Sequence, residues 1–160
     1  MITLLDIQKA IGKKLDSKFN THYIYTEQVK QGLKRPSFFV NIMPISTNNY
    51  VAYKDKLINV DIMYFSKNET STENLEMINL LEDLFKMLLT IQDRKITIES
   101  LNFKVVDNIL HCIFSLDFSD SDIKLIDTLN GQIFNSEIKE ELGYTVDTIT
   151  TMQELEIEEV

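Results

Sequence analysis

The sequence contains few of the residues from which most recognisable active sites are built. Its 160 residues include four glycines, two histidines, one cysteine and no tryptophan. The glycines lie apart, which excludes the glycine-rich turns that cradle phosphate groups. Neither His22 nor His111 has a second histidine, a cysteine or a carboxylate at the spacing of a metal site, so a structural role is favoured for both. We therefore predict no catalytic, cofactor-binding or metal-binding residues, and a binding or assembly module rather than an enzyme.

Cysteine and long apolar runs are also scarce. A single cysteine, Cys112, excludes an internal disulfide, and its alternation with Leu110 and Phe114 predicts a buried thiol. No apolar run approaches the roughly 20 residues that a membrane-spanning helix needs. The first residues lack the basic start and apolar block of a signal peptide. We expect no signal peptide and no membrane partner.

The best-defined stretch of the sequence is residues 35–66, which predicts two long antiparallel strands joined by a hairpin around Asn48 and Asn49. In the second strand one face is plainly core, made by Ile58, Val60, Ile62 and Tyr64. The other face is mixed, and in the first strand Phe39, Met43 and Ile45 make it more apolar than a solvated face should be. This surplus suggests a sheet that is covered on its second side too, for example by another subunit.

The remaining elements complete an α+β fold. Apolar residues at helical spacing predict a first helix over 4–19, with a capping box formed by Thr3 and Asp6, and a second helix from Ser71 or Thr72 to about Ile91. The apolar stripe of the second helix is wider than one sheet requires, so it is either sandwiched or partnered. Short strands are predicted over 23–25, 95–99, 101–106 and 109–118, with a tight turn at Asp107–Asn108. The fold class is therefore an antiparallel sheet with a long central hairpin, packed by an N-terminal helix and a long middle helix.

We divide the chain into an α+β domain over 1–120 and an extension over 121–160. The extension contains an Asn130–Gly131 pair that is typical of a hairpin, and an acidic end. Leu155 and Ile157 alternate with glutamates there, as in a strand that pairs with a sheet edge of this or a neighbouring subunit. A frayed acidic tail is the other interpretation.

The net charge of −9 is unevenly distributed along the chain. Residues 1–66 contain nine lysines or arginines and five acidic residues, whereas residues 67–160 contain seven and twenty. Such asymmetry bears on partners rather than on fold. The candidate partner-binding residues, which could meet an acidic protein or a nucleic-acid backbone, are Lys30, Lys34, Arg35, Lys54 and Lys56. A solvated lysine-rich loop is the simpler interpretation of the same residues.

Four stretches together resemble the tail terminator, or tail completion, proteins of long-tailed phages and phage-tail-like particles of low-GC Gram-positive bacteria. They are residues 2–11, 24–40, 60–65 and 152–156. None is a catalytic signature, so the resemblance depends on their order and spacing. It covers most of residues 1–118 and then the last few, while the segment 121–151 is longer than the family leads us to expect.

The resemblance implies a structural protein that forms a homohexameric ring at the head-proximal end of a tail. The ring would stop tube and sheath polymerisation and provide the neck interface. Its partners would be other copies of itself, tail tube and sheath proteins, and neck or connector proteins, with possible DNA passage through the ring. It would belong to a virion or a phage-tail-like particle, with a contractile tail, assembled in the bacterial host cytoplasm. The alternatives are a head–tail connector and a small soluble enzyme.

Overall fold

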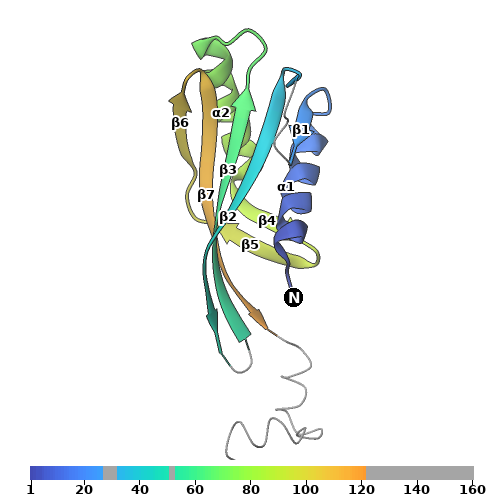
Figure 1. Cartoon of the computed structure of the whole chain (residues 1–160), viewed down its shortest axis with the longest axis vertical. Helices are drawn as coiled ribbons and strands as arrows, with labels where there is room; N and C mark the ends of the chain where they lie inside the picture. The colour runs from blue at the N-terminus through green and yellow to red at the C-terminus, as the bar shows by residue number, and fades with distance from the viewer. Residues whose placement is uncertain (27–31, 51–52, 122–160) are drawn as a thin grey trace, which may run out of the picture. The chain divides into compact units, whose positions relative to one another are not determined.

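The computed structural model of the chain describes residues 1–26, 32–50 and 53–121 (Figure 1). Apart from Ser121, the predicted extension 121–160 lies outside the described residues, and so does Lys30.

The first helix, α1 (Leu4–Lys18), begins where the sequence predicts. Thr3 accepts a hydrogen bond from the Asp6 backbone N–H at 3.2 Å, and Asp6 accepts one from the Thr3 backbone N–H at 2.9 Å. This reciprocal capping box satisfies two donors that a helix start otherwise leaves unpaired. The apolar stripe of α1, formed by Ile7, Ile11 and Leu15, is fully buried.

The central hairpin is confirmed, and it forms the middle of a five-stranded sheet in the order β1-β2-β3-β7-β6. The strands are β1 (Tyr23–Tyr25), β2 (Ser37–Asn49), β3 (Tyr53–Phe65), β6 (Asn102–Val106) and β7 (Ile109–Ser121). β2 and β3 are antiparallel from Ser37 opposite Phe65 to Asn49 opposite Lys54. β1 runs parallel to β2, whereas β6 and β7 are antiparallel, and both Asp107 and Asn108 of their turn have positive φ. Such φ values are those of the predicted tight hairpin turn.

The middle helix is shorter than predicted. α2 (Ser71–Phe85) ends at Phe85, and Met87 has φ 69°, outside the helical region. The residues that follow form a strand, β4 (Met87–Ile91), which pairs with β5 (Arg94–Ile98) in a separate two-stranded sheet. Apolar runs of this length suit a strand as well as a helix, and pairing with β5 decides between them. Part of the apolar surface attributed to the helix therefore belongs to β4, namely Met87, Leu88, Leu89 and Ile91.

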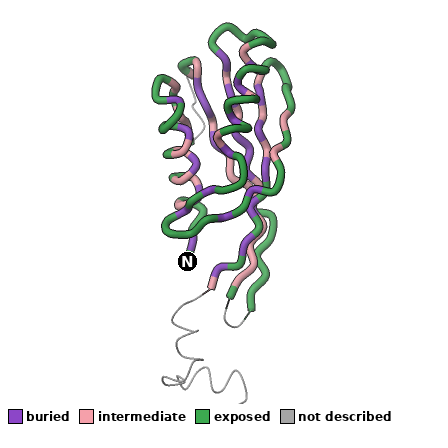
Figure 2. The backbone as a smooth tube through the Cα atoms, turned by 180° about the vertical axis from the view of Figure 1, so that it is seen from behind, coloured by how far each residue is buried: buried purple, intermediate pink, exposed green. Residues whose placement is uncertain are grey.

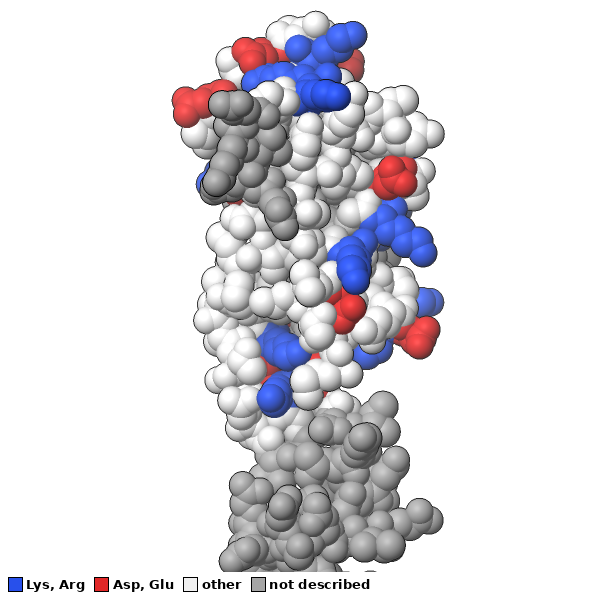
Figure 3. All heavy atoms as spheres, turned by 45° about the vertical axis from the view of Figure 1, so that its right-hand side comes forward, with Lys and Arg blue, Asp and Glu red and all other residues white. Residues whose placement is uncertain are grey.

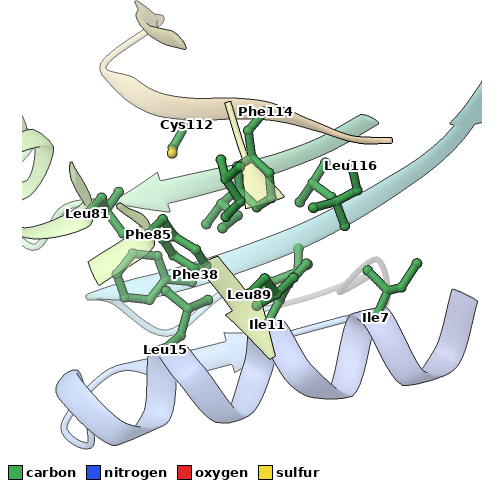
Figure 4. Packing of buried hydrophobic residues seen from close by; sticks show 14 of the residues in the cluster. Ile7, Ile11, Leu15, Phe38, Leu81, Phe85, Leu89, Cys112, Phe114 and Leu116 are labelled. Carbon is green, nitrogen blue, oxygen red and sulfur yellow. The ribbon is translucent and has the colours of Figure 1, made fainter. Parts of the chain in front are cut away.

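One hydrophobic core joins the helices, the β4–β5 hairpin and one face of the large sheet. In Figure 4, Ile7, Ile11 and Leu15 of α1 point toward the sheet, and Leu89 of β4 lies against Ile11. The predicted core face of β3 is buried, with Val60 and Ile62 at 0% exposure, and so is Cys112 on β7. Seen from behind, α2 and the β4–β5 hairpin lie over the sheet (Figure 2).

The opposite face of the sheet carries half-buried residues. They include Phe39 and Met43 on β2, Met63 and Phe65 on β3, and Ile113 on β7. Ile45 differs from the sequence prediction, because the β2–β3 register shifts between Pro44 and Ser46 and interrupts the alternation at this residue. Its side chain is 55% exposed. Whether another subunit covers this face remains a prediction.

Candidate interaction surfaces

The structure separates the predicted partner-binding residues into two groups. Lys34 and Arg35 precede β2, whereas Lys54 and Lys56 lie near the start of β3, at the other end of the hairpin. At about 3.3 Å per residue, twelve residues of strand place the two groups roughly 40 Å apart. On the face shown in Figure 3, lysines and arginines gather in separate places, with uncharged and acidic surface between them. These residues therefore do not form a single basic patch.

Lys34 and Arg35 are held by aromatic side chains at the β1 end of the sheet. The Lys34 ammonium lies 5.4 Å from the centre of the Tyr23 ring, and the Arg35 guanidinium lies 5.8 Å from that of Phe65. Arg35 also pairs with Glu69 at 2.6 Å, and a third of its side chain is exposed. Such cation–π contacts fix the direction of a cation while leaving it accessible. This pair can meet an acidic partner.

Lys56 has an internal role instead. Its ammonium lies 2.9 Å from Asp120 Oδ2 and donates to the Ile2 carbonyl at 2.7 Å, and its side chain is only 15% exposed. Asp120 also accepts from the Ile2 backbone N–H at 2.8 Å and pairs with Arg94 at 3.1 Å. Asp120 therefore joins the N-terminus, β3, β5 and β7 at one buried carboxylate.

The electrostatic balance at Asp120 favours the charged form. Burial by itself raises the pKa of this carboxyl. The hydrogen bonds from Lys56 and the Ile2 N–H, together with the charge of Lys56, outweigh burial and hold the pKa of Asp120 below its usual value. The group is a charged structural anchor rather than a proton donor near neutral pH.

The two histidines and the cysteine occupy structural positions. His22 packs against Phe19 and Phe38, with ring centres 5.4 and 5.5 Å apart, and burial lowers the pKa of His22. His111 Nδ1 lies 3.0 Å from Asp61 Oδ2 across the open sheet face. Burial raises the pKa of the Cys112 thiol to about 12, which removes the thiolate that reactivity requires. Among the described residues, no three metal-ligating side chains converge.

A groove between α1 and β4 was not predicted from the sequence. It is an open hollow of about 540 Å³, lined on the helix side by Lys9, Lys13 and Lys14 and on the strand side by Leu89 and Thr90. The lysines recur at helical spacing, so the sequence contained part of the signal. The other wall could not be foreseen, because β4 was assigned to the helix.

The fold and these surfaces define the class of protein, which is an α+β domain with several candidate binding surfaces. Its described surface carries a lysine-lined groove, separated cationic groups and a half-buried sheet face. No described helix is both long enough and apolar enough to cross a membrane.

Comparison with known families identifies that class more closely. A family model described as "Phage tail terminator protein" matches residues 6–128, which is most of the chain. The chain therefore belongs to the phage tail terminator family, as its sequence resemblance indicated. A search of curated proteins gives no match. Membership makes the protein a structural component of a phage tail, and so of a virion, that interacts with other tail components.

Proposed function

We propose that this protein closes a growing tail by forming a ring on its head-proximal end. In the proposal a homohexamer caps the tube and sheath, stops their polymerisation and presents the neck interface, with an axial opening for DNA. Assembly takes place in the bacterial host cytoplasm, and the particle is a contractile phage tail or a related bacteriocin-like particle. The observation that carries this proposal is the family match over residues 6–128.

Features of the sheet support repeated contacts between subunits. Beyond Phe39, β2 has no strand on its outer side among the described residues, because β1 pairs only with Ser37–Phe39. The half-buried sheet face adjoins that open edge. A closed ring buries such heterologous surfaces against the next subunit, which removes an edge that would otherwise risk aggregation.

Within this proposal the cationic residues contact an acidic surface of the tube or sheath end. Lys34 and Arg35, with Lys30 near them in sequence, make one contact, and Lys54 makes another. Lys56 already pairs with Asp120, so it is left unchanged in the test. The extension 121–160 serves as a second domain, in which Leu155 and Ile157 form a strand exchanged between subunits.

Deleting the gene and measuring tail lengths by electron microscopy tests the terminator role. Overlong tails without heads, restored to normal length by the supplied protein, are the expected result. Tails of normal length that fail to join heads would indicate a head–tail connector instead. Normal tails joined to normal heads would contradict both roles.

Charge reversal tests the docking contact. The variant Lys34→Glu/Arg35→Glu should fail to restore tail length, while Lys67→Glu, an exposed lysine after β3, should restore it. Thermal unfolding of both variants separates lost docking from lost folding. Full restoration by the folded double variant would rule out this contact.

A further inference from the structure

The groove between α1 and β4 combines an apolar floor with a cationic rim. Ala10 and Leu89 contribute to the floor, and Leu89 is itself 1% exposed. Lys9 and Lys13 are exposed on the rim, one helical turn apart. Among the described residues, neither lysine has a carboxylate within ion-pair distance. The groove therefore places positive charge next to apolar surface.

Lys14, which lines the groove, contacts the backbone of β4. Its ammonium donates to the Leu88 carbonyl at 2.7 Å and lies 5.7 Å from the centre of the Phe85 ring, and burial lowers the pKa of Lys14. The Leu88 carbonyl therefore faces α1. Backbone groups alternate along a strand, so the N–H and C=O of Thr90 face the same side. β5 is the only strand that pairs with β4 in the described part of the chain, which leaves Thr90 able to accept a passing strand.

Most of the net negative charge of the protein lies in residues 122–160, and this charge is complementary to the lysines of the groove. Residues 122–160 contain ten acidic residues and two lysines, and so account for nearly all of the net charge of −9. Residues 152–160 contain four glutamates, no basic residue, and the alternating pair Leu155 and Ile157. An extended segment of this kind has an apolar side for the floor and an acidic side for the rim.

The spacing of the charges also matches. Glutamates two residues apart on an extended strand, such as Glu154 and Glu156, are separated by roughly 6.6 Å. Lys9 and Lys13, four residues apart on a helix, are separated by about 6 Å along its axis. Two neighbouring carboxylates can therefore meet two neighbouring ammonium groups without bending either chain.

We propose that the groove between α1 and β4 receives the acidic segment 152–160 of a second copy of this chain. Leu155 and Ile157 lie on the floor, the glutamates pair with Lys9 and Lys13, and the strand pairs with the Thr90 backbone. This deepens the exchanged-strand part of the proposed function, on which it rests, by naming the acceptor.

Nucleic acid is the less suitable occupant of this groove. Residues 1–121 as a whole contain fourteen basic and fifteen acidic residues, so they lack the basic excess of a nucleic-acid-binding domain. A peptide with both acidic and apolar residues uses the rim and the floor together.

Disulfide trapping between full-length copies tests the proposal. One preparation carries Thr90→Cys and the other carries Leu155→Cys or Ile157→Cys, and the two are mixed and oxidised. Cys112 stays in place, because it is fully buried and its thiolate is suppressed. The matched control replaces Thr90→Cys by Val105→Cys on β6, because Thr90 and Val105 are both exposed. We expect at least tenfold more cross-linked dimer from the Thr90→Cys mixture.

Charge swapping then tests the recognition chemistry. Adding Lys9→Glu/Lys13→Glu to the Thr90→Cys copy should lower dimer formation to the control level, and Glu154→Lys/Glu156→Lys on the other copy should restore it. Lys67→Glu/Lys104→Glu should leave it unchanged. Equal cross-linking at Thr90 and Val105 overturns the proposal. Cross-linking at the control level, with duplex DNA binding that Lys9→Glu/Lys13→Glu abolishes, would assign the groove to nucleic acid.

The cross-linking experiment and the gene deletion test separate claims. If the protein gives no specific cross-link but its deletion changes tail length, only the groove assignment is refuted. If the protein cross-links as expected but deletion of its gene leaves tail length unchanged, only the terminator role is refuted.

Discussion

Asp120 shows how a single residue can hold several elements together. Its side chain is almost fully buried and contacts two cations and one backbone N–H, which come from three separate parts of the chain. Removing one partner from a buried ionic group usually costs about 3 kcal/mol or more, because the remaining charges lose their counterion. Asp120→Asn should therefore lower the free energy of unfolding by about 3 kcal/mol. Urea titration measures this, and Asp117→Asn, an exposed neighbour on β7, should change little.

The same carboxyl predicts a pH dependence. An unfolded aspartate titrates near 3.9, whereas hydrogen bonds and the charge of Lys56 lower the pKa of Asp120 in the folded protein. The unfolded state therefore takes up the proton at a higher pH than the folded state. The stabilisation is complete above the unfolded pKa and is lost as pH falls toward the lower folded pKa. As pH falls below about 4, unfolding free energy should fall more steeply for the native chain than for Asp120→Asn, and parallel curves would contradict this.

Among the secondary-structure elements, the junction between α2 and β4 is one place where the chain tolerates backbone strain. Met87 has φ 69°, a left-handed conformation that costs residues with a β-carbon about 1 kcal/mol, and its side chain is 72% exposed. Met87→Gly should therefore stabilise the protein by about 0.5–1 kcal/mol, measured by thermal or urea unfolding. Met87→Ala keeps the β-carbon and should give little gain. A loss of stability in the glycine variant would mean that the methionine side chain matters more than its backbone.

The elements that could be predicted from the sequence are those with local signals. α1 was marked by its capping box, the β2–β3 hairpin by two alternating strands, and the turn at Asp107–Asn108 by its residue types. The end of α2 was missed, since Met87–Ile91 is apolar in either conformation and only its pairing with Arg94–Ile98 decides. That pairing also creates one wall of the lysine-lined groove, so the groove could not be foreseen. The separation of Lys34 from Lys54 follows from hairpin length, which was available in the sequence.

The whole molecule divides its charge in an unusual way. The α+β part is close to neutral, while residues 122–160 contain most of the net negative charge. A nearly neutral body has little long-range repulsion between copies, which favours packing subunits side by side. The acidic segment can then act as a separate contact that recognises cations on a neighbour. Salt should weaken this second contact more than the first, because exposed charges are screened and buried apolar surface is not.

Ile45 on β2 is an exposed apolar residue beside the open sheet edge, and we expect it to lie at the contact between subunits of the proposed ring. If the purified protein forms the proposed hexamer, light scattering should give a mass of about 112 kDa, which is six times the 18.6 kDa of one chain. Ile45→Asp should raise the subunit dissociation constant by at least about tenfold, because a carboxylate is costly to bury at an interface.

Leu75 provides the matched control for Ile45. It is exposed to a similar degree, 63% against 55%, but lies on α2 away from the open edge of β2. Leu75→Asp should leave the mass unchanged, and both variants should unfold at about the native temperature, since neither side chain is in the core. If both aspartates dissociate the ring equally, the contact is not specific to the β2 edge. If neither does, subunits meet through another surface, and the open edge must be covered by a different tail component.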